Sequence, residues 1–138
     1  MKEKTFNLEF NGCWRESNKS SIPDKSGIYC VYECTYDEKT KKVRLCQLIY
    51  IGESENVRDR LSGHEKQKDW KKHVGAGNEL CYSFAEVDSN DRVCVEAAFI
   101  YVFKPLENTE YKDNFPFGRT IIFSNGEKFL LSNHIGVS

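Results

Sequence analysis

The chain contains 138 residues with a net charge of −1, and 39% of its residues are hydrophobic while 30% are charged. This length suits one domain with its own core, so we interpret residues 1–138 as a single domain. The near-neutral charge excludes a global basic field and leaves local patches as the route to phosphate binding. No apolar run reaches the length of a membrane span, and the N-terminus shows no secretory signal. We therefore expect a cytoplasmic protein with no membrane partner.

The first part of the chain predicts a short arm followed by a hairpin. Residues 1–20 are mixed in character, with aromatic anchors that suit an arm packed on the core. Residues 28–36 and 43–51 are rich in β-branched and aromatic side chains, with a charged tip between them. Such a hairpin would bring Tyr29 and Tyr50 close together at its open end.

The middle of the chain predicts helices around one more strand. Asn56 is a good N-cap for a short helix, and a second helical piece follows near residues 69–73. Residues 80–87 predict a third strand. The apolar segment 93–103 follows an N-cap signal and predicts a buried helix, which the Lys104-Pro105 step ends.

Residues 119–124 and 128–131 predict a late hairpin around the turn Asn125-Gly126. The expected fold class is therefore mixed α/β (α+β), with a small antiparallel sheet and helices packed on it. Residues 110–138 form an extension that covers the sheet, binds a partner or contacts substrate, and a packing role is the simplest of these.

Six cysteines stand at positions 13, 30, 34, 46, 81 and 94, without any C-x-x-C pair. Several lie in apolar runs, where a free thiol behaves as a small hydrophobic side chain. We interpret them as reduced core thiols, because no histidine has a cysteine partner at zinc-ligand spacing. A small redox or metal-storage protein stays open on the cysteine count alone.

Glu96 is the single charge in the apolar segment 93–103. A buried carboxylate needs a base, a cation or a proton, so Glu96 is either an ion-paired rim residue or a ligand for a hard divalent cation. Arg60, on the predicted helix after Asn56, is either a solvated side chain or a two-pronged phosphate contact.

Further candidates surround these two residues. Positive charge gathers at residues 39–44 and again at 58–73, and each cluster is either a solvated face or a phosphate-binding patch. From the second cluster we select Arg58, His64 and Lys66 as nucleic-acid contacts, and His64 would also suit proton transfer near neutral pH. Asn108 alone is an ordinary turn residue, but in the context of the other candidates we also select it as a nucleic-acid contact.

Taken together, these residues resemble a known pattern. The segment Ser26-Gly27-Ile28-Tyr29 resembles the first motif of the GIY-YIG nucleases, and residues 48–61, with Tyr50-Ile51-Gly52 and Arg60, resemble the second motif and its helix. The family's glutamate falls on Glu96 and its asparagine on Asn108. The resemblance covers about residues 22–109, which we take as the core of the domain.

The resemblance implies a three-stranded antiparallel sheet flanked by helices and a divalent metal, Mg²⁺ or Mn²⁺, held by Glu96. It implies that Tyr50 or Tyr29 helps to activate water and that Arg60 steadies the phosphate. We prefer Tyr50 as the base or base relay, with Tyr29 as its hydrogen-bonding partner.

The function expected from the resemblance is metal-dependent hydrolysis of phosphodiester bonds in DNA, duplex or branched. The alternative is a non-catalytic nucleic-acid-binding or adaptor module with the same fold. The chain carries no separate DNA-binding domain of the kind seen in some members of the family. Targeting would then come from the domain itself, from a homodimer or from a protein partner.

Overall fold

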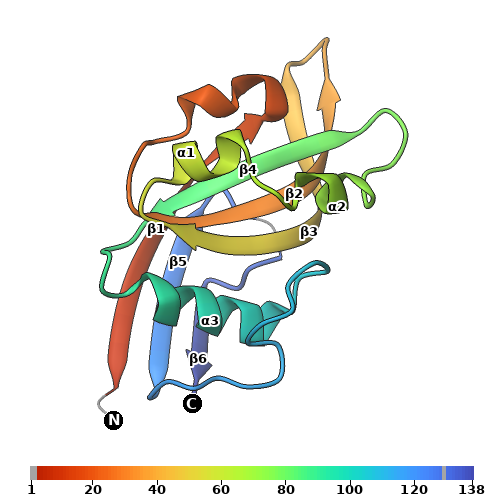
Figure 1. Ribbon diagram of the computed structural model, residues 1–138. Helices are drawn as coiled ribbons and strands as arrows, with labels where there is room; N and C mark the ends of the chain where they lie inside the picture. Colours follow the sequence, from red (N-terminus) through yellow and green to blue (C-terminus); the bar gives the residue numbers. More distant parts are fainter. Residues whose placement is uncertain (1–2, 129) are drawn as a thin grey trace.

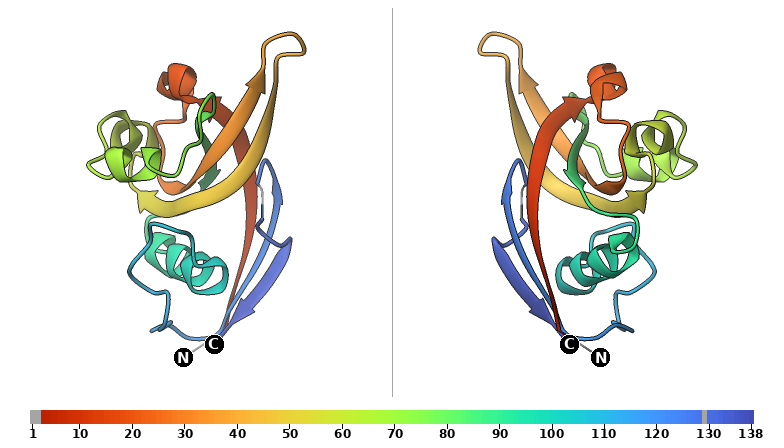
Figure 2. Two further views of the ribbon diagram at one scale, coloured as in Figure 1. Left: turned by 90° about the vertical axis from the view of Figure 1, so that its right-hand side faces the viewer. Right: turned by 90° about the vertical axis from the view of Figure 1, so that its left-hand side faces the viewer.

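The protein, described here from a computed structural model over residues 3–128 and 130–138, is built around one six-stranded sheet. The sheet is mixed and curls into a half-barrel, with the strand order β3-β2-β4-β1-β5-β6 (Figures 1 and 2). Its strands are β1 (Lys4–Arg15), β2 (Gly27–Asp37), β3 (Lys42–Ser54), β4 (Glu79–Glu86), β5 (Thr120–Gly126) and β6 (His134–Val137).

Few helices accompany the sheet. They are the 3₁₀ helix η1 (Glu16–Ser21) and the α-helices α1 (Val57–Ser62), α2 (Gln67–Lys71) and α3 (Arg92–Phe103). Among the described residues, no helix is long and apolar enough to cross a membrane.

The expected three-stranded antiparallel sheet flanked by helices is wrong. The predicted arm is the long strand β1, which pairs antiparallel with β4 and parallel with β5. The C-terminal extension supplies β5 and β6, so it continues the sheet instead of covering it. The parallel β1–β5 pairing joins two strands more than a hundred residues apart, and local sequence patterns carry no signal for such a contact.

The predicted β2–β3 hairpin is confirmed, and β2 is buried along most of its length. Its residues pair with β3 on one side and β4 on the other. Side chains alternate along a strand, so Ile28 and Cys30 enter the core beneath α3, whereas Tyr29 and Val31 enter a second core beneath α1 and α2. Figure 2 shows these helices on the two sides of the β2–β3–β4 region.

Two glycines allow the close approaches that this arrangement requires. A Cβ atom on Gly27 would lie 2.2 Å from the carbonyl oxygen of Ala85 in β4. A Cβ atom on Gly52 would lie 2.3 Å from the ring and hydroxyl of Tyr29, its partner across the β2–β3 pair. Both strand glycines therefore make room for a neighbour, and Gly52 makes room for a candidate site residue.

The late hairpin differs from its prediction. β5 pairs with β6 at residues 134–137, and the described residues of the predicted return strand, 128 and 130–131, lie outside any strand. Phe129 lies outside the described residues. Asn125 and Gly126 do not form a turn but belong to β5 and pair with β1. The pairing satisfies backbone N–H and C=O groups of both strands that a tight turn at these residues would leave without partners.

All six cysteines are free thiols in the structure. Cys30, Cys34, Cys81 and Cys94 are buried, whereas Cys46 is exposed. The four buried thiols belong to the core that α3 helps to form, in agreement with the prediction of core thiols.

Candidate active site

A polar cleft of about 220 Å³ lies where β3, the α1–α2 connection, α3 and the segment after α3 meet. It brings together residues that are far apart in the sequence. Its lining comprises Tyr50, Arg60, Glu65, Lys66, Glu96, Ile100, Asn108, Thr109 and Glu110. The cleft thus unites three of the four predicted catalytic residues, and the fourth, Tyr29, lies directly behind Tyr50.

The two tyrosines lie on the same face of the β2–β3 hairpin. Their ring centroids are 6.2 Å apart, because Tyr29 pairs with Gly52 and Tyr50 with Val31 in the strand register. Tyr29 is fully buried, and burial raises the pKa of its hydroxyl well above the usual range. Burial also raises the pKa of Tyr50 to about 12, with a further contribution from Glu96. Both hydroxyls therefore carry their protons at neutral pH.

His64 connects Tyr29 to the connection between α1 and α2. Its Nε2 atom lies 3.0 Å from the Tyr29 hydroxyl, and its Nδ1 atom accepts a hydrogen bond of 3.1 Å from the Lys66 backbone N–H. Because Nδ1 is the acceptor, the proton of the neutral ring lies on Nε2 and is donated to Tyr29. Burial, and then the positive charge of Arg60, lower the pKa of His64 to about 4.

Trp70 of α2 completes an aromatic cluster behind the cleft. Its ring lies 4.4 Å from the His64 ring and 5.1 Å from the Tyr50 ring, measured between centroids. The tryptophan is fully buried, so it fixes the orientation of both neighbours by packing. Sequence reasoning missed Trp70, since a single tryptophan in a charged segment predicts a core anchor at most.

Arg60 enters the cleft from α1. Asn56 caps this helix as predicted, because its side chain accepts a hydrogen bond of 3.1 Å from the Asp59 N–H. The Arg60 guanidinium donates to both oxygens of Glu65, over 2.7 and 2.8 Å. This pairing raises the pKa of Arg60 above its usual range and lowers the pKa of Glu65 to about 2.

Glu96 faces the cleft from α3 and is half-buried. Burial, and then the negative charges of Glu53 and Glu110, raise the pKa of its carboxyl to about 8. A hydrogen bond from the Glu53 backbone offsets only part of this effect. Lys66 also offsets a smaller part, and no described residue forms an ion pair with Glu96. A bound cation would favour the ionised form of this carboxyl.

The residues around Glu96 fit an open divalent-metal site. No group of three or more histidine, cysteine, aspartate or glutamate side chains suited to a metal occurs among residues 3–128 and 130–138. Mg²⁺ does not need such a group, because it commonly keeps several waters and binds one or two carboxylates together with substrate phosphate oxygens. Glu96 would hold the ion, and Glu110 lies near enough to perturb the same carboxyl.

Asn108 is buried and clamps the edge strand β3. Its side chain accepts from the Ile51 N–H and donates to the Ile51 carbonyl, both over 2.9 Å. The neighbouring Glu107 N–H donates to the Ile49 carbonyl over 2.9 Å. These bonds fix the backbone on either side of Tyr50 and satisfy a strand edge that would otherwise be open. Its predicted contact with nucleic acid stays a prediction.

The remaining predicted contacts separate into two places. Lys66 lines the cleft, and its ammonium lies 5.2 Å from the Tyr50 ring centroid. Arg58 points elsewhere, since its Nε donates to the Ile22 carbonyl over 2.6 Å and its guanidinium approaches Asp24. The structure therefore brings Lys66, but not Arg58, to the predicted catalytic residues.

Glu65 is the main cleft residue that sequence reasoning missed. It lies in the turn between α1 and α2, five residues after Arg60, where neither helical nor strand periodicity applies. The only sequence signal for Glu65 was its charge, opposite to that of Arg60 five residues earlier. Such pairs are common on solvated surfaces and do not indicate a site.

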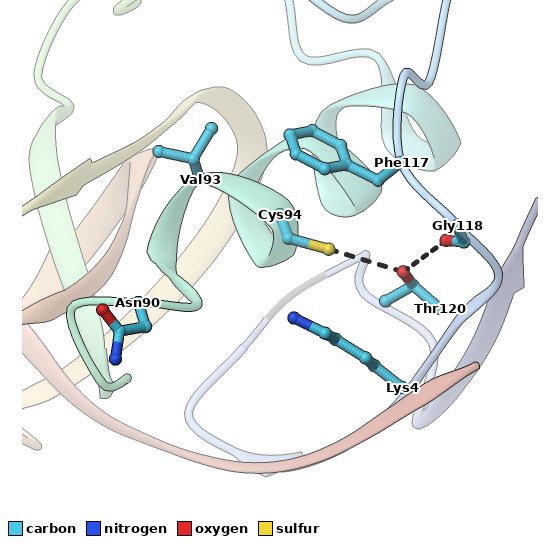
Figure 3. Close-up of a pocket in the computed structure, with 7 residues that line it drawn as sticks. All are labelled: Lys4, Asn90, Val93, Cys94, Phe117, Gly118 and Thr120. Atoms are coloured by element: carbon cyan, nitrogen blue, oxygen red, sulfur yellow. Dashed lines mark hydrogen bonds between the residues drawn. The ribbon is translucent and has the colours of Figure 1, made fainter. Parts of the chain in front are cut away.

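A larger cavity of about 320 Å³ lies near the N-terminal end of α3, outside this site (Figure 3). Its walls are mostly apolar. The Cys94 thiol donates to the Thr120 hydroxyl over 3.4 Å, because that hydroxyl itself donates to the Gly118 carbonyl. The thiol proton is thus held in place, and the cavity contains none of the predicted site residues.

The cleft thus places a guanidinium, a half-buried carboxyl and a tyrosine hydroxyl around one polar space. The chain is 32% identical over 94 residues to a UvrABC system protein C from Fervidobacterium nodosum. The aligned part covers 67% of this chain but only 15% of that relative. No family model matches the chain, and no solved structure matches it.

Proposed function

We propose that this protein is a metal-dependent endonuclease of the GIY-YIG type that hydrolyses phosphodiester bonds in DNA. The single observation that carries the proposal is the cleft that unites Tyr50, Arg60 and Glu96. Hydrolysis of a phosphodiester needs a positive group for the developing charge, a route for the proton of water and, in many enzymes, a metal ion. One residue of the cleft suits each requirement.

Arg60 is suited to hold the phosphate. Its guanidinium presents two parallel donors, as its pairing with Glu65 demonstrates, and two phosphate oxygens match the same geometry. Glu96 is suited to hold Mg²⁺ or Mn²⁺, since burial and like charges leave its carboxylate in need of a cation. The ion, when bound, supplies Lewis-acid stabilisation and lowers the pKa of coordinated water.

Tyr50 is suited to pass on the proton of the attacking water. Its pKa of about 12 makes it a proton relay at neutral pH, because a standing phenolate would be scarce. The positive charge of Arg60 favours the deprotonated form of Tyr50, and a cation at Glu96 would remove the charge that opposes it. Tyr29, fixed by His64, positions the neighbouring ring, and the proton that Tyr50 gives up passes to solvent at the cleft.

The similarity to a UvrABC system protein C supports a nuclease-related function. DNA as substrate is what the resemblance of the motifs implies. A cytoplasmic setting, which reduced thiols suit, is also part of the proposal. The aligned part covers 15% of that relative. A homodimer or a targeting partner belongs to this proposal. Lys66 and the lysine-rich tip between β2 and β3 are the surfaces suited to the DNA backbone.

Incubation of the purified protein with supercoiled plasmid and Mg²⁺ tests the proposal. We expect nicking by the wild type and a loss of about 100-fold or more in Glu96→Gln, since the metal ligand is lost. Glu86→Gln, an exposed glutamate outside the cleft, is the matched control and should cleave normally. Absence of cleavage by the wild type, or equal cleavage by Glu96→Gln, would refute the proposal.

A non-catalytic nucleic-acid-binding module is the second candidate. It is favoured by the pairing of Arg60 with Glu65, which occupies the guanidinium that catalysis would need. This function predicts DNA binding that weakens with salt, without cutting at any Mg²⁺ or Mn²⁺ concentration. The plasmid assay with a parallel binding titration separates the two functions.

A further inference from the structure

The Arg60 guanidinium is already occupied in the free protein. Its two terminal nitrogens donate to the two oxygens of Glu65, over 2.7 and 2.8 Å, and both side chains line the cleft. A carboxylate in this two-pronged geometry presents the same pair of acceptors as two oxygens of a phosphate. The position that Arg60 would offer to a phosphodiester is therefore filled by a residue of the chain itself.

The occupant is held loosely by its surroundings. The Glu65 side chain is 65% exposed, and the Arg60 side chain is 36% exposed. Exposed ion pairs are usually weak, and the two-pronged geometry makes this pair stronger than most of them, so an incoming anion displaces the carboxylate at a modest cost. Glu65 also belongs to the turn between α1 and α2, so its side chain can swing out without moving either helix.

A second cation beside the pair favours such an exchange. Lys66 lies on the same turn and lines the cleft, so it attracts an incoming anion, whereas Glu110 opposes it. A phosphate that replaces Glu65 keeps both hydrogen bonds of Arg60 and gains the attraction of Lys66. The released carboxylate returns to solvent, where its charge is well hydrated.

We propose that Glu65 is an internal competitor for Arg60, which a DNA phosphate must displace before the cleft is engaged. This inference rests on the proposed function only in naming DNA as the displacing ligand. Glu65 then lowers the affinity of the site for every phosphate ligand by the cost of breaking its pair with Arg60.

Fluorescence anisotropy with a short labelled DNA duplex, in EDTA and low salt, tests the inference without hydrolysis. We expect Glu65→Gln to bind about two- to fivefold more tightly than the wild type, which is the range for an exposed ion pair. Glu110→Gln removes the same charge from the same cleft but does not touch Arg60, so its gain should be clearly smaller. In an Arg60→Gln background, Glu65→Gln should change the affinity no more than Glu110→Gln does.

Several outcomes would overturn the inference. Equal gains in Glu65→Gln and Glu110→Gln would mean that only the net charge of the cleft matters. The inference would also be overturned if the gain from Glu65→Gln persisted in the Arg60→Gln background. Unchanged affinity, or no measurable binding, in Glu65→Gln would overturn it as well. If Glu65→Gln binds more tightly but the wild type does not cleave plasmid, the nuclease proposal is refuted and the role of Glu65 as a competitor is supported. If the wild type cleaves plasmid but Glu65→Gln has unchanged affinity, only the role of Glu65 is refuted.

Discussion

The Nε2 atom of His64 lies 3.0 Å from the hydroxyl of Tyr29 and donates its proton to that oxygen. The direction of this bond follows from the Lys66 backbone N–H, which occupies the other ring nitrogen. His64 therefore orients the buried tyrosine as a neutral donor. Because Nε2 carries the proton, His64 cannot accept one from Tyr29. His64 is therefore excluded as the base that acts through Tyr29.

The low pKa of His64 predicts a specific loss of stability in mild acid. The folded-state pKa of about 4 lies below the ordinary value of 6.5, so the unfolded chain binds more protons between these values. The contribution of neutral His64 to the free energy of unfolding is complete above pH 6.5. It is lost as the pH falls toward 4, with an upper limit of about 3 kcal/mol. Urea titrations from pH 4 to 7 should show this slope in the wild type and a flatter one in His64→Gln. Equal slopes would contradict the assignment.

The raised pKa of Glu96 predicts the opposite pH dependence. With a folded-state pKa of about 8 against 4.5, the folded chain binds more protons, so stability falls as the pH rises through this interval. Glu96→Gln should therefore be more stable than the wild type at pH 8, by about 1–3 kcal/mol. Added Mg²⁺ should raise the melting temperature of the wild type and not that of Glu96→Gln. Equal shifts in both proteins would place the ion elsewhere.

Gly52→Ala should disturb Tyr29 directly. The new methyl group would lie 2.3 Å from the Tyr29 ring, so the ring must move and its bond to His64 must lengthen. We expect a loss of about 1–3 kcal/mol in unfolding free energy, together with reduced plasmid nicking. Gly63→Ala is the control, because a methyl group there would meet nothing within 4 Å and the φ of −152° is open to alanine. Comparable losses in both variants would argue against a special role for Gly52.

Asn108→Asp should weaken the clamp on β3 while preserving side-chain size. The aspartate can still accept from the Ile51 N–H, but it cannot donate to the Ile51 carbonyl when ionised. We expect a loss of about 1–3 kcal/mol, measured by chemical denaturation, because a buried carbonyl loses its partner. Hydrogen exchange at Ile51 should accelerate in the same variant. Unchanged stability would mean that the clamp is dispensable.

Thiol labelling separates the cysteine-based alternative from the others. Cys46 is exposed and should react first in the native protein, followed by the partly buried Cys13. The four buried thiols should react only after unfolding, so intact mass spectrometry should show six adducts in denaturant. Six adducts and no bound zinc would end the redox or metal-storage interpretation. Fewer than six would revive it.

The part of the site that sequence reasoning predicted is the part built from local patterns. The hairpin that joins Tyr29 to Tyr50 follows from two strand-like runs and a charged tip, and the cap at Asn56 follows from its residue type. The helix that carries Glu96 begins and ends near the predicted residues, with its C-terminal cap at Lys104.

The parts that sequence reasoning did not reach depend on contacts between distant segments. Nothing in residues 4–15 specifies whether an alternating run will pack as an arm or pair with two strands at once. The clamp between Asn108 and Ile51 joins residues that are 57 positions apart. Glu65 lies in a turn, where no periodic signal exists, so only its position beside Arg60 reveals its importance.

The parallel pairing of β1 with β5 also has a consequence for how the protein is made. β1 leaves the ribosome before both of its neighbours, and one of them, β5, is complete only at residue 126. Until then, the edge of β1 from Lys4 to Phe10 has no partner, and the apolar surface around it stays open to chaperones or to aggregation. The cleft is assembled from residues 50–110, but the sheet that supports it must wait for almost the whole chain.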